Sequence, residues 1–198
     1  MTRLGAGLLV GFAVLAALVL ALGPGPILGE EHVLAGLEAA RTPELTAWVR
    51  GVTSLGGWFG QLPLVIGSAV LLAATGRRKE AGALLLLCLA GYFVMNGAKL
   101  AMDRPRPDAA HAVYRATGLS FPSGHASVSM FFFLGLGLIV RREGKRWPLG
   151  VLVAIAMLVG LTRPYLGVHY PSDVVGGWLM AGGLTLVGAG WVSARGRA

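Results

Sequence analysis

The chain has 198 residues, of which 55% are hydrophobic and 13% charged, and its mean hydropathy is +0.70. This composition excludes an ordinary soluble domain, and several apolar runs approach the length that crosses a bilayer. A net charge of +8 would favour a nucleic-acid partner in a soluble protein, but here the basic residues form short clusters between apolar runs. We therefore expect a membrane protein that is embedded in the lipid bilayer and binds no nucleic acid.

Six apolar segments are candidate membrane spans. They predict an all-α fold, a polytopic bundle of six transmembrane helices in a single domain over residues 1–198. The single cysteine, Cys88, lies inside one of these segments, so no internal disulfide can form. The expected spans are residues 4–23, 58–75, 81–100, 124–140, 147–163 and 173–194.

The basic residues mark one side of this predicted bundle. With six spans, four Lys/Arg groups fall on the same side, which the positive-inside rule assigns to the cytoplasm. Both termini of this multi-pass cell-membrane protein are then cytoplasmic, and the connections 24–57, 101–123 and 164–172 lie outside. The four groups are Arg3; Arg77, Arg78 and Lys79; Arg141, Arg142, Lys145 and Arg146; and Arg195 and Arg197.

The first apolar segment has an alternative interpretation as a cleaved signal peptide behind Thr2 and Arg3. Its apolar run is longer than the core of a usual signal peptide, and Gly23-Pro24-Gly25-Pro26 offers no convincing small-residue cleavage site. We therefore treat this segment as a span.

The connection 24–57 is the longest one, and it contains a helix start. Thr42 is a good N-cap, Pro43 suits the first turn, and Glu44 is favourable beside the helix dipole. Apolar residues then recur at helical spacing, at Leu45, Trp48, Val49 and Val52. The pattern predicts a short amphipathic helix on the outer membrane surface or, alternatively, a helix packed over the bundle as a lid.

Three sets of polar residues lie at the outer ends of the predicted spans, where charged groups are candidates for function. Each set alone has a simpler explanation, because cations can reach lipid headgroups, serine can cap a helix, and His and Asp can pair on a helix surface. Their convergence on one predicted side favours a shared site. The sets are Lys99 with Arg104 and Arg106; Ser123, Gly124 and His125; and Arg163 with His169 and Asp173.

These residue types suit a phosphate group. Arginine offers a planar donor fork to oxygens, lysine a point charge, and a helix N-terminus free amide hydrogens. Histidine can transfer a proton near neutral pH or act as a nucleophile, and a neighbouring carboxylate would stabilise the cation formed. In this interpretation Ser123 and Gly124 hold the phosphate and His125 handles the proton. No Cys/His cluster or carboxylate-rich set predicts a metal site, and we expect neither a metal nor another cofactor.

The spacing of these residues resembles a known family. The chain contains, in order, Lys-x6-Arg-Pro, Pro-Ser-Gly-His and Arg-x5-His-x3-Asp, and the three motifs lie between Lys99 and Asp173. Motifs in this order and on one predicted side resemble the type 2 phosphatidic acid phosphatase superfamily, the membrane lipid phosphatases related to vanadium-dependent haloperoxidases. The six-span layout extends the resemblance over most of the chain.

The resemblance implies a phosphatase that works through a phosphohistidine. His169 would attack phosphorus, Asp173 would orient and activate His169, and His125 would protonate the leaving group and then activate water. The substrate would be a membrane lipid phosphate, such as phosphatidylglycerophosphate, undecaprenyl diphosphate or phosphatidate, hydrolysed at the outer face. The residues implied to bind phosphate oxygens are Lys99, Arg106, Ser123, Gly124 and Arg163.

Two positions bear on the match to the family pattern. Thr162 stands where the family commonly has serine before the arginine, and because the hydroxyl is retained we expect little consequence. In the tandem Arg-Pro-Arg-Pro the spacing selects Arg106, although Arg104 could share its role.

Two other functions are compatible with a cradle for an oxyanion. A vanadate-dependent peroxidase would use the same residues, although those relatives are larger and soluble. A non-catalytic phosphate or lipid transporter would use the outer basic cavity, although the paired halves that transporters often show are not visible in the sequence.

Overall fold

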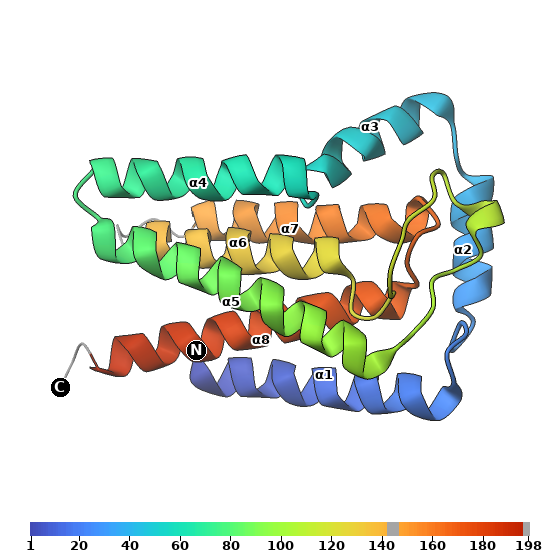
Figure 1. The fold of residues 1–198 in the computed structure, drawn as a ribbon, viewed down its shortest axis with the longest axis horizontal. Helices are drawn as coiled ribbons and strands as arrows, with labels where there is room; N and C mark the ends of the chain where they lie inside the picture. Colours follow the sequence, from blue (N-terminus) through green and yellow to red (C-terminus); the bar gives the residue numbers. More distant parts are fainter. Residues whose placement is uncertain (142–146, 196–198) are drawn as a thin grey trace.

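The computed structural model describes residues 1–141 and 147–195, and every regular element in this part of the chain is helical. The prediction of an all-α fold is therefore confirmed. Figure 1 shows long helices packed side by side, with α2 lying across one end of the bundle. The elements are α1 (Thr2–Leu22), α2 (Glu30–Ala39), α3 (Pro43–Ser54), α4 (Trp58–Ala74), α5 (Arg78–Met102), the 3-10 helix η1 (Ala109–His111), α6 (Gly124–Val140), α7 (Trp147–Tyr165) and α8 (Pro171–Arg195).

Four of these helices, α1, α5, α7 and α8, are long and apolar enough to cross a bilayer. Helices α3 and α4 pass the same test only together, as a pair that bends by 45° at the break between them. Helix α6 is apolar but has 17 residues, at the short end of the range for a span. All six predicted segments coincide with helices whose ends differ by only a few residues, while their number as membrane spans stays a prediction.

Helix α6 is the most enclosed helix of the bundle because its sequence is apolar on every side. Its aromatic residues Phe131, Phe132 and Phe133 are buried, and the helix contacts α5, α7 and α8. A helix that is hydrophobic all round is stable only when other helices or lipid surround it. The surrounding helices therefore fix the position of α6, and with it the Pro-Ser-Gly-His motif at its start.

Helices α1 and α8 pack closely through glycines. A side chain at Gly5 would lie 2.8 Å from the Gly183 carbonyl oxygen, and a side chain at Gly183 would lie 2.7 Å from Leu9. The other side of α1 exposes large apolar residues, including Val10 and Val14. This helix thus turns small residues toward its neighbour and large ones outward, as membrane helices commonly do.

The connection 24–57 contains two helices rather than the one predicted. Helix α3 begins at Pro43, and the Thr42 hydroxyl accepts a hydrogen bond from Leu45 N at 3.2 Å, as the sequence indicated. Helix α2 was not predicted. Helix α3 packs against α7, and the Thr46 hydroxyl lies 3.0 Å from the Tyr165 hydroxyl. It therefore covers the end of α7, while its position relative to a membrane surface stays a prediction.

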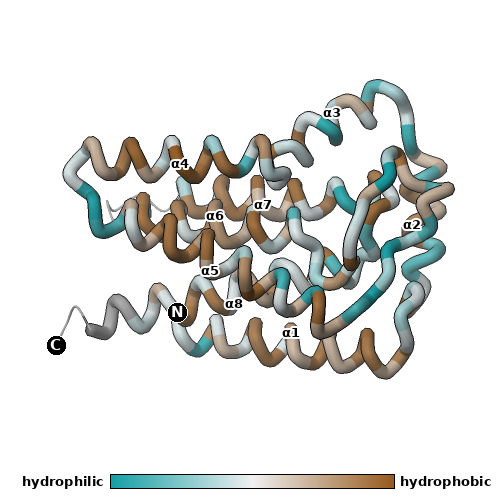
Figure 2. The backbone as a smooth tube through the Cα atoms, in the orientation of Figure 1, coloured by the Kyte–Doolittle hydropathy of each residue, from teal (hydrophilic) through white to brown (hydrophobic). Residues whose placement is uncertain are grey.

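The two ends of the bundle differ in the segments and in the basic residues that lie there. In Figure 1 the N-terminus and the end of α8 lie toward the end of the α4–α5 connection, and α2 and the loop before α6 lie at the other end. Figure 2 shows hydrophobic colour along the helices and hydrophilic segments mainly in the connections. The basic group at residues 77–79 lies where α4 leads into α5, with Arg77 in the connection and Arg78 and Lys79 at the start of α5. Arg142, Lys145, Arg146 and Arg197, which belong to other predicted basic groups, lie outside the described residues.

We expect an impermeant thiol reagent to label Ala109→Cys, but not Lys79→Cys, in intact cells that carry Cys88→Ala as the background. Ala109 and Lys79 are both exposed, the first in η1 and the second at the start of α5. The positive-inside rule assigns the α4–α5 connection to the cytoplasm. Labelling of Lys79→Cys without Ala109→Cys would show the reverse orientation, and permeabilised cells provide the control in which both variants react.

Candidate active site

The three polar sets of the sequence meet at one end of the bundle. Lys99 lies in the last turn of α5, Ser123 is the N-cap of α6, and Arg163 lies in the last turn of α7. His169 lies in the loop between α7 and α8, and Asp173 in the first turn of α8. The Ser123 amide donates to the Asp173 carbonyl oxygen at 2.8 Å, which joins the starts of α6 and α8.

The loop that carries His169 depends on a glycine. Gly167 has a φ of +72°, and a side chain there would lie 2.7 Å from the His111 carbonyl oxygen. Arg41 supports the same loop, because its side chain donates to the Tyr165 carbonyl oxygen at 2.9 Å and to that of His111 at 2.7 Å. Helix α8 then starts at Pro171, a residue favoured at the first helical position.

His169 is almost completely buried and is held at both ring nitrogens. Its Nδ1 lies 3.2 Å from Ser120 Oγ and 3.3 Å from Asp173 Oδ2, and its Nε2 lies 2.8 Å from Arg106 Nη1. Arginine only donates, so Nε2 accepts and the ring proton is assigned to Nδ1. Burial, followed by the charge of Arg106, lowers the pKa of His169 well below its usual value. The imidazole is therefore neutral near pH 7, with the lone pair of Nε2 directed at a cation.

The Asp173 carboxylate is fully buried and surrounded by donors. Its Oδ1 accepts from Arg104 Nη1 at 2.8 Å, and its Oδ2 accepts from the Tyr170 amide at 2.8 Å and from the Ser120 hydroxyl. Several donors on one carboxylate favour its charged form and fix its orientation. Asp173 is thus held as an acceptor for the Nδ1 proton of His169.

Arg104 and Arg106 have different partners, because Arg104 donates to the Asp173 carboxylate and Arg106 contacts the His169 ring. Its side chain is 1% exposed, donates to Asp173 and, at 3.0 Å, to Glu30, and lies 4.2 Å from the centre of the Tyr170 ring. The motif spacing selected Arg106 and left open whether Arg104 shares its role. The structure separates them, because only Arg106 contacts the His169 ring.

The remaining cations border the space beside His169. The Lys99 ammonium donates to the Leu119 carbonyl oxygen at 2.6 Å, and Arg163 Nη1 donates to Thr53 Oγ1 at 2.7 Å. Burial, followed by the nearby charge of Arg163, lowers the pKa of Arg106 below its usual value. The cations therefore crowd one another, and a bound anion would relieve this repulsion.

Two buried polar atoms of this site, Ser123 Oγ and Arg163 Nε, have no hydrogen-bond partner within the described residues. Buried polar groups are normally paired, so unpaired ones at a polar site are candidates to bind a polar ligand. Ser123 and Gly124 open α6, where amide hydrogens of the first turn have no partner inside the helix. The arrangement offers a hydroxyl, a guanidinium nitrogen and a helix N-terminus to an oxyanion.

His125 lies beside these groups, in the first turn of α6. Its ring lies close enough to Arg163 and His169 for their charges to act on it. The ring makes no hydrogen bond to another described residue. A side chain at Gly57, in the α3–α4 connection, would lie 3.5 Å from His125 Nε2. The ring is therefore free to donate to, or accept from, a group bound at the site.

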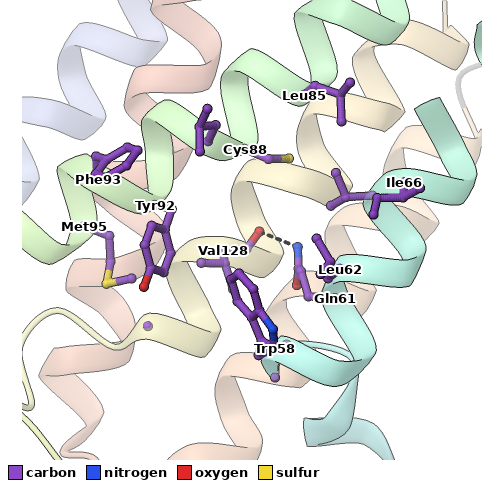
Figure 3. A pocket seen from close by; sticks show the side chains of 15 residues that line it. Trp58, Gln61, Leu62, Ile66, Leu85, Cys88, Tyr92, Phe93, Met95 and Val128 are labelled. Atoms are coloured by element: carbon purple, nitrogen blue, oxygen red, sulfur yellow. Dashed lines mark hydrogen bonds between the residues drawn. The ribbon is translucent and has the colours of Figure 1, made fainter. Parts of the chain in front are cut away.

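An apolar cavity of about 710 Å³ adjoins the site between α4, α5 and α6. Gly124 and Gly57 line it near His125, and Ile66 and Leu85 line its far part. Figure 3 shows the side chains of α4 facing those of α5, with α6 between them and Gln61 Nε2 donating to the Val128 carbonyl oxygen at 3.0 Å. Other lining residues that it labels are Trp58, Leu62, Cys88, Tyr92, Phe93 and Met95.

Three residues at the site were not predicted from the sequence. Ser120 hydrogen-bonds to Asp173 and His169, and Thr53 hydrogen-bonds to Arg163. The ring centre of Tyr114 lies 5.8 Å from the Arg163 guanidinium. None belongs to a motif, and only the position of Ser120 just before Phe-Pro-Ser-Gly-His could have suggested a role. The hydroxyl of Thr162 donates to the Val159 carbonyl oxygen, so it serves α7 rather than the site.

In the described ranges 1–141 and 147–195, no three His, Cys, Asp or Glu side chains are grouped so that they could hold a metal ion. The charged and titratable side chains gathered at the site are cations, two histidines and a carboxylate.

Comparisons with known proteins agree with this geometry. A family model described as the PAP2 superfamily matches residues 80–197. Phosphatidylglycerophosphatase B of Bacillus subtilis is 34% identical to this chain over 147 residues, which cover 70% of each chain. Undecaprenyl-diphosphatase BcrC of the same organism is 32% identical over 97 residues, which cover 47% of this chain and 48% of BcrC. The crystal structure of a transmembrane PAP2-type phosphatidylglycerolphosphate phosphatase from Bacillus subtilis superposes with a TM-score of 0.79 at 28% identity, covering 96% of both chains. The matched region contains all three motifs, and the chain therefore belongs to the PAP2 superfamily, as a membrane phosphoric ester or diphosphate hydrolase.

Proposed function

We propose that this protein hydrolyses a phosphomonoester or diphosphate of a membrane lipid, through a phosphohistidine on His169, at the outer face of the membrane. The observation that carries the proposal is the state of the His169 ring. Its Nδ1 proton is held by Asp173 and Ser120, and its Nε2 lone pair faces Arg106, where a phosphate would displace or share the contact. A neutral, oriented imidazole next to cations is suited to attack on phosphorus.

In the first step, His169 Nε2 forms a bond to phosphorus while the bond from phosphorus to the leaving oxygen breaks. His125 gives a proton to that oxygen, and Asp173 stabilises the positive charge that develops on the His169 ring. The guanidinium and ammonium groups of Lys99, Arg106 and Arg163 stabilise the oxygens of the transferred phosphoryl group.

In the second step, water attacks phosphorus and the bond between phosphorus and Nε2 breaks. His125, which lost its proton in the first step, accepts one from the water. Inorganic phosphate then leaves, and His169 returns to its neutral state with its proton on Nδ1, facing the Asp173 carboxylate. The protein ends the cycle in the state in which it began.

The apolar cavity between α4 and α5 supports a lipid substrate. It begins at Gly57 and Gly124, beside the phosphate site, and its wall is apolar as far as Leu85 and Ile66. A hydrocarbon chain attached to a phosphate at the start of α6 would find a matching surface there. The candidate lipids are phosphatidylglycerophosphate, undecaprenyl diphosphate and phosphatidate, the first two because relatives carry those names.

The experiment that tests the proposal is phosphate release by the purified protein in detergent from these three lipids and from a soluble phosphomonoester. We expect release from at least one lipid at a higher kcat/KM than from the soluble compound. Binding of a lipid phosphate without release would support a transporter, and vanadate-dependent halide oxidation would support a peroxidase.

The two histidines are expected to differ in their dependence on the leaving group. His125→Ala forfeits proton donation, which typically contributes about 10²–10⁴-fold in rate. This loss should be smaller for p-nitrophenyl phosphate, whose leaving group needs no proton, than for a lipid phosphate. His169→Ala should be inactive on both substrates. An equal loss on both substrates for His125→Ala would contradict its role as the general acid.

The cavity gives a second prediction, tested with two tryptophan substitutions on α5. Cys88 lines the cavity, whereas Leu86 is 67% exposed and is not among its lining residues. Cys88→Trp should raise KM for a long-chain lipid phosphate and leave p-nitrophenyl phosphate hydrolysis nearly unchanged, because the indole fills the space for the chain. Leu86→Trp is the matched control and should behave like the unmodified protein. If both variants bind the long-chain lipid equally well, the cavity does not hold its chain.

Activity is also expected to persist in a metal chelator and to fall with orthovanadate. The cations that we assign to the phosphate oxygens are the side chains of Lys99, Arg106 and Arg163, and vanadate mimics five-coordinate phosphorus. Phosphate release is measured with and without each reagent. A complete loss in chelator that magnesium restores would contradict this assignment.

A further inference from the structure

Glu30 is a buried carboxylate that lies outside all three motifs. It is the first residue of α2, in the first outer connection, and the family match begins only at residue 80. Its side chain is 7% exposed, although the next residue, Glu31, has a side chain that is 54% exposed. Burying a carboxylate is costly unless cations and hydrogen bonds compensate, so the contacts of Glu30 require an explanation.

The carboxylate of Glu30 is engaged on both oxygens. Its Oε1 accepts from the Ser172 amide at 2.6 Å, and its Oε2 accepts from Arg104 Nη2 at 3.0 Å and from the Ile27 amide at 2.9 Å. The Ser172 amide belongs to the first turn of α8, one residue before Asp173. A negative charge at this helix start is electrostatically favourable.

Arg104 extends the connection from Glu30 to the catalytic carboxylate. Its Nη1 donates to Asp173 Oδ1 at 2.8 Å and to Ser172 Oγ at 2.7 Å, while Nη2 faces Glu30. Glu30 thus holds Asp173 by two routes, one through the guanidinium and one through the neighbouring backbone amide. A carboxylate, a guanidinium, a second carboxylate and the His169 ring follow one another in a buried chain.

We propose that Glu30 is a positioning residue for the Asp173–His169 pair, and this inference rests on the proposed function. Arg104 donates to both Glu30 and Asp173, so the charge of Glu30 weakens the interaction of Arg104 with Asp173. The Asp173 carboxylate then stabilises the His169 ring more strongly as that ring becomes positive. Without the charge of Glu30, Arg104 would shift toward Asp173, and the start of α8 would lose an acceptor. The rate of attack on phosphorus should then fall.

Substrate binding should not change with Glu30, because its contacts do not include Lys99, Arg106 or Arg163. A purely structural role would give a different result, since lower stability would reduce the amount of folded protein without changing the rate of each folded molecule. A split between kcat and KM, measured per folded molecule, therefore separates the two roles.

The experiment compares Glu30→Gln with Glu31→Gln, its exposed neighbour on the same helix turn. Single-turnover formation of phosphoenzyme is followed with a lipid phosphate, and the folded fraction is measured by size-exclusion chromatography and thermal unfolding in detergent. We expect Glu30→Gln to form phosphoenzyme about 10- to 100-fold more slowly, the range measured for outer partners of metal-bound histidines, with an unchanged KM. Glu31→Gln should match the unmodified protein.

Glu30→Asp, which keeps the charge on a shorter side chain, should recover part of the rate. If Glu30→Gln does not fold, Ser172→Ala replaces it, because this variant removes one acceptor of Arg104 and should also slow phosphoenzyme formation. An unchanged rate per folded molecule in the folded variants, or a loss confined to KM, would overturn the inference. Failure of the proposed function is seen separately, as the absence of phosphoenzyme in the unmodified protein.

Discussion

A carboxylate buried among the ends of several helices needs hydrogen-bond donors, and this requirement organises the end of the bundle that carries the site. Asp173 meets it with Arg104 from the loop after α5, Ser120 from the loop before α6, and the Tyr170 amide at the start of α8. Each donor brings a different segment to the same point. The His169 ring is placed as a result, because its Nδ1 proton faces the same carboxylate.

The second constraint is an excess of positive charge beside that pair. Lys99, Arg106 and Arg163 lie close enough for their positive charges to repel one another. Such an arrangement is unfavourable in an empty site and becomes favourable when an anion binds. Residues placed for function commonly cost stability in this way. The unpaired Ser123 Oγ and Arg163 Nε fit the same explanation.

The sequence predicted the positions of the long helices, and it selected polar residues that the structure brings together at one end, because both leave strong local patterns. Apolar runs mark the spans, and the three motifs keep their spacing. Helix α2 leaves no such pattern, since its N-cap is Gly29 in a left-handed conformation without a side-chain cap. The separate contacts of Arg104 and Arg106 were also hidden, because Arg104 reaches Asp173 and Glu30, 69 and 74 positions away, and Arg106 reaches His169, 63 positions away. Long-range pairs of this kind appear only in three dimensions.

The most direct test of this account is to find which atom carries the phosphoryl group during turnover. Protein quenched in alkali, which preserves phosphohistidine, would be digested and analysed by mass spectrometry, with phosphorus NMR to distinguish the two ring nitrogens. We predict phosphate on His169 at Nε2, since Nδ1 is occupied by its proton and faces Asp173. Phosphate on His125, on Nδ1 of His169, or on no histidine at all would contradict it.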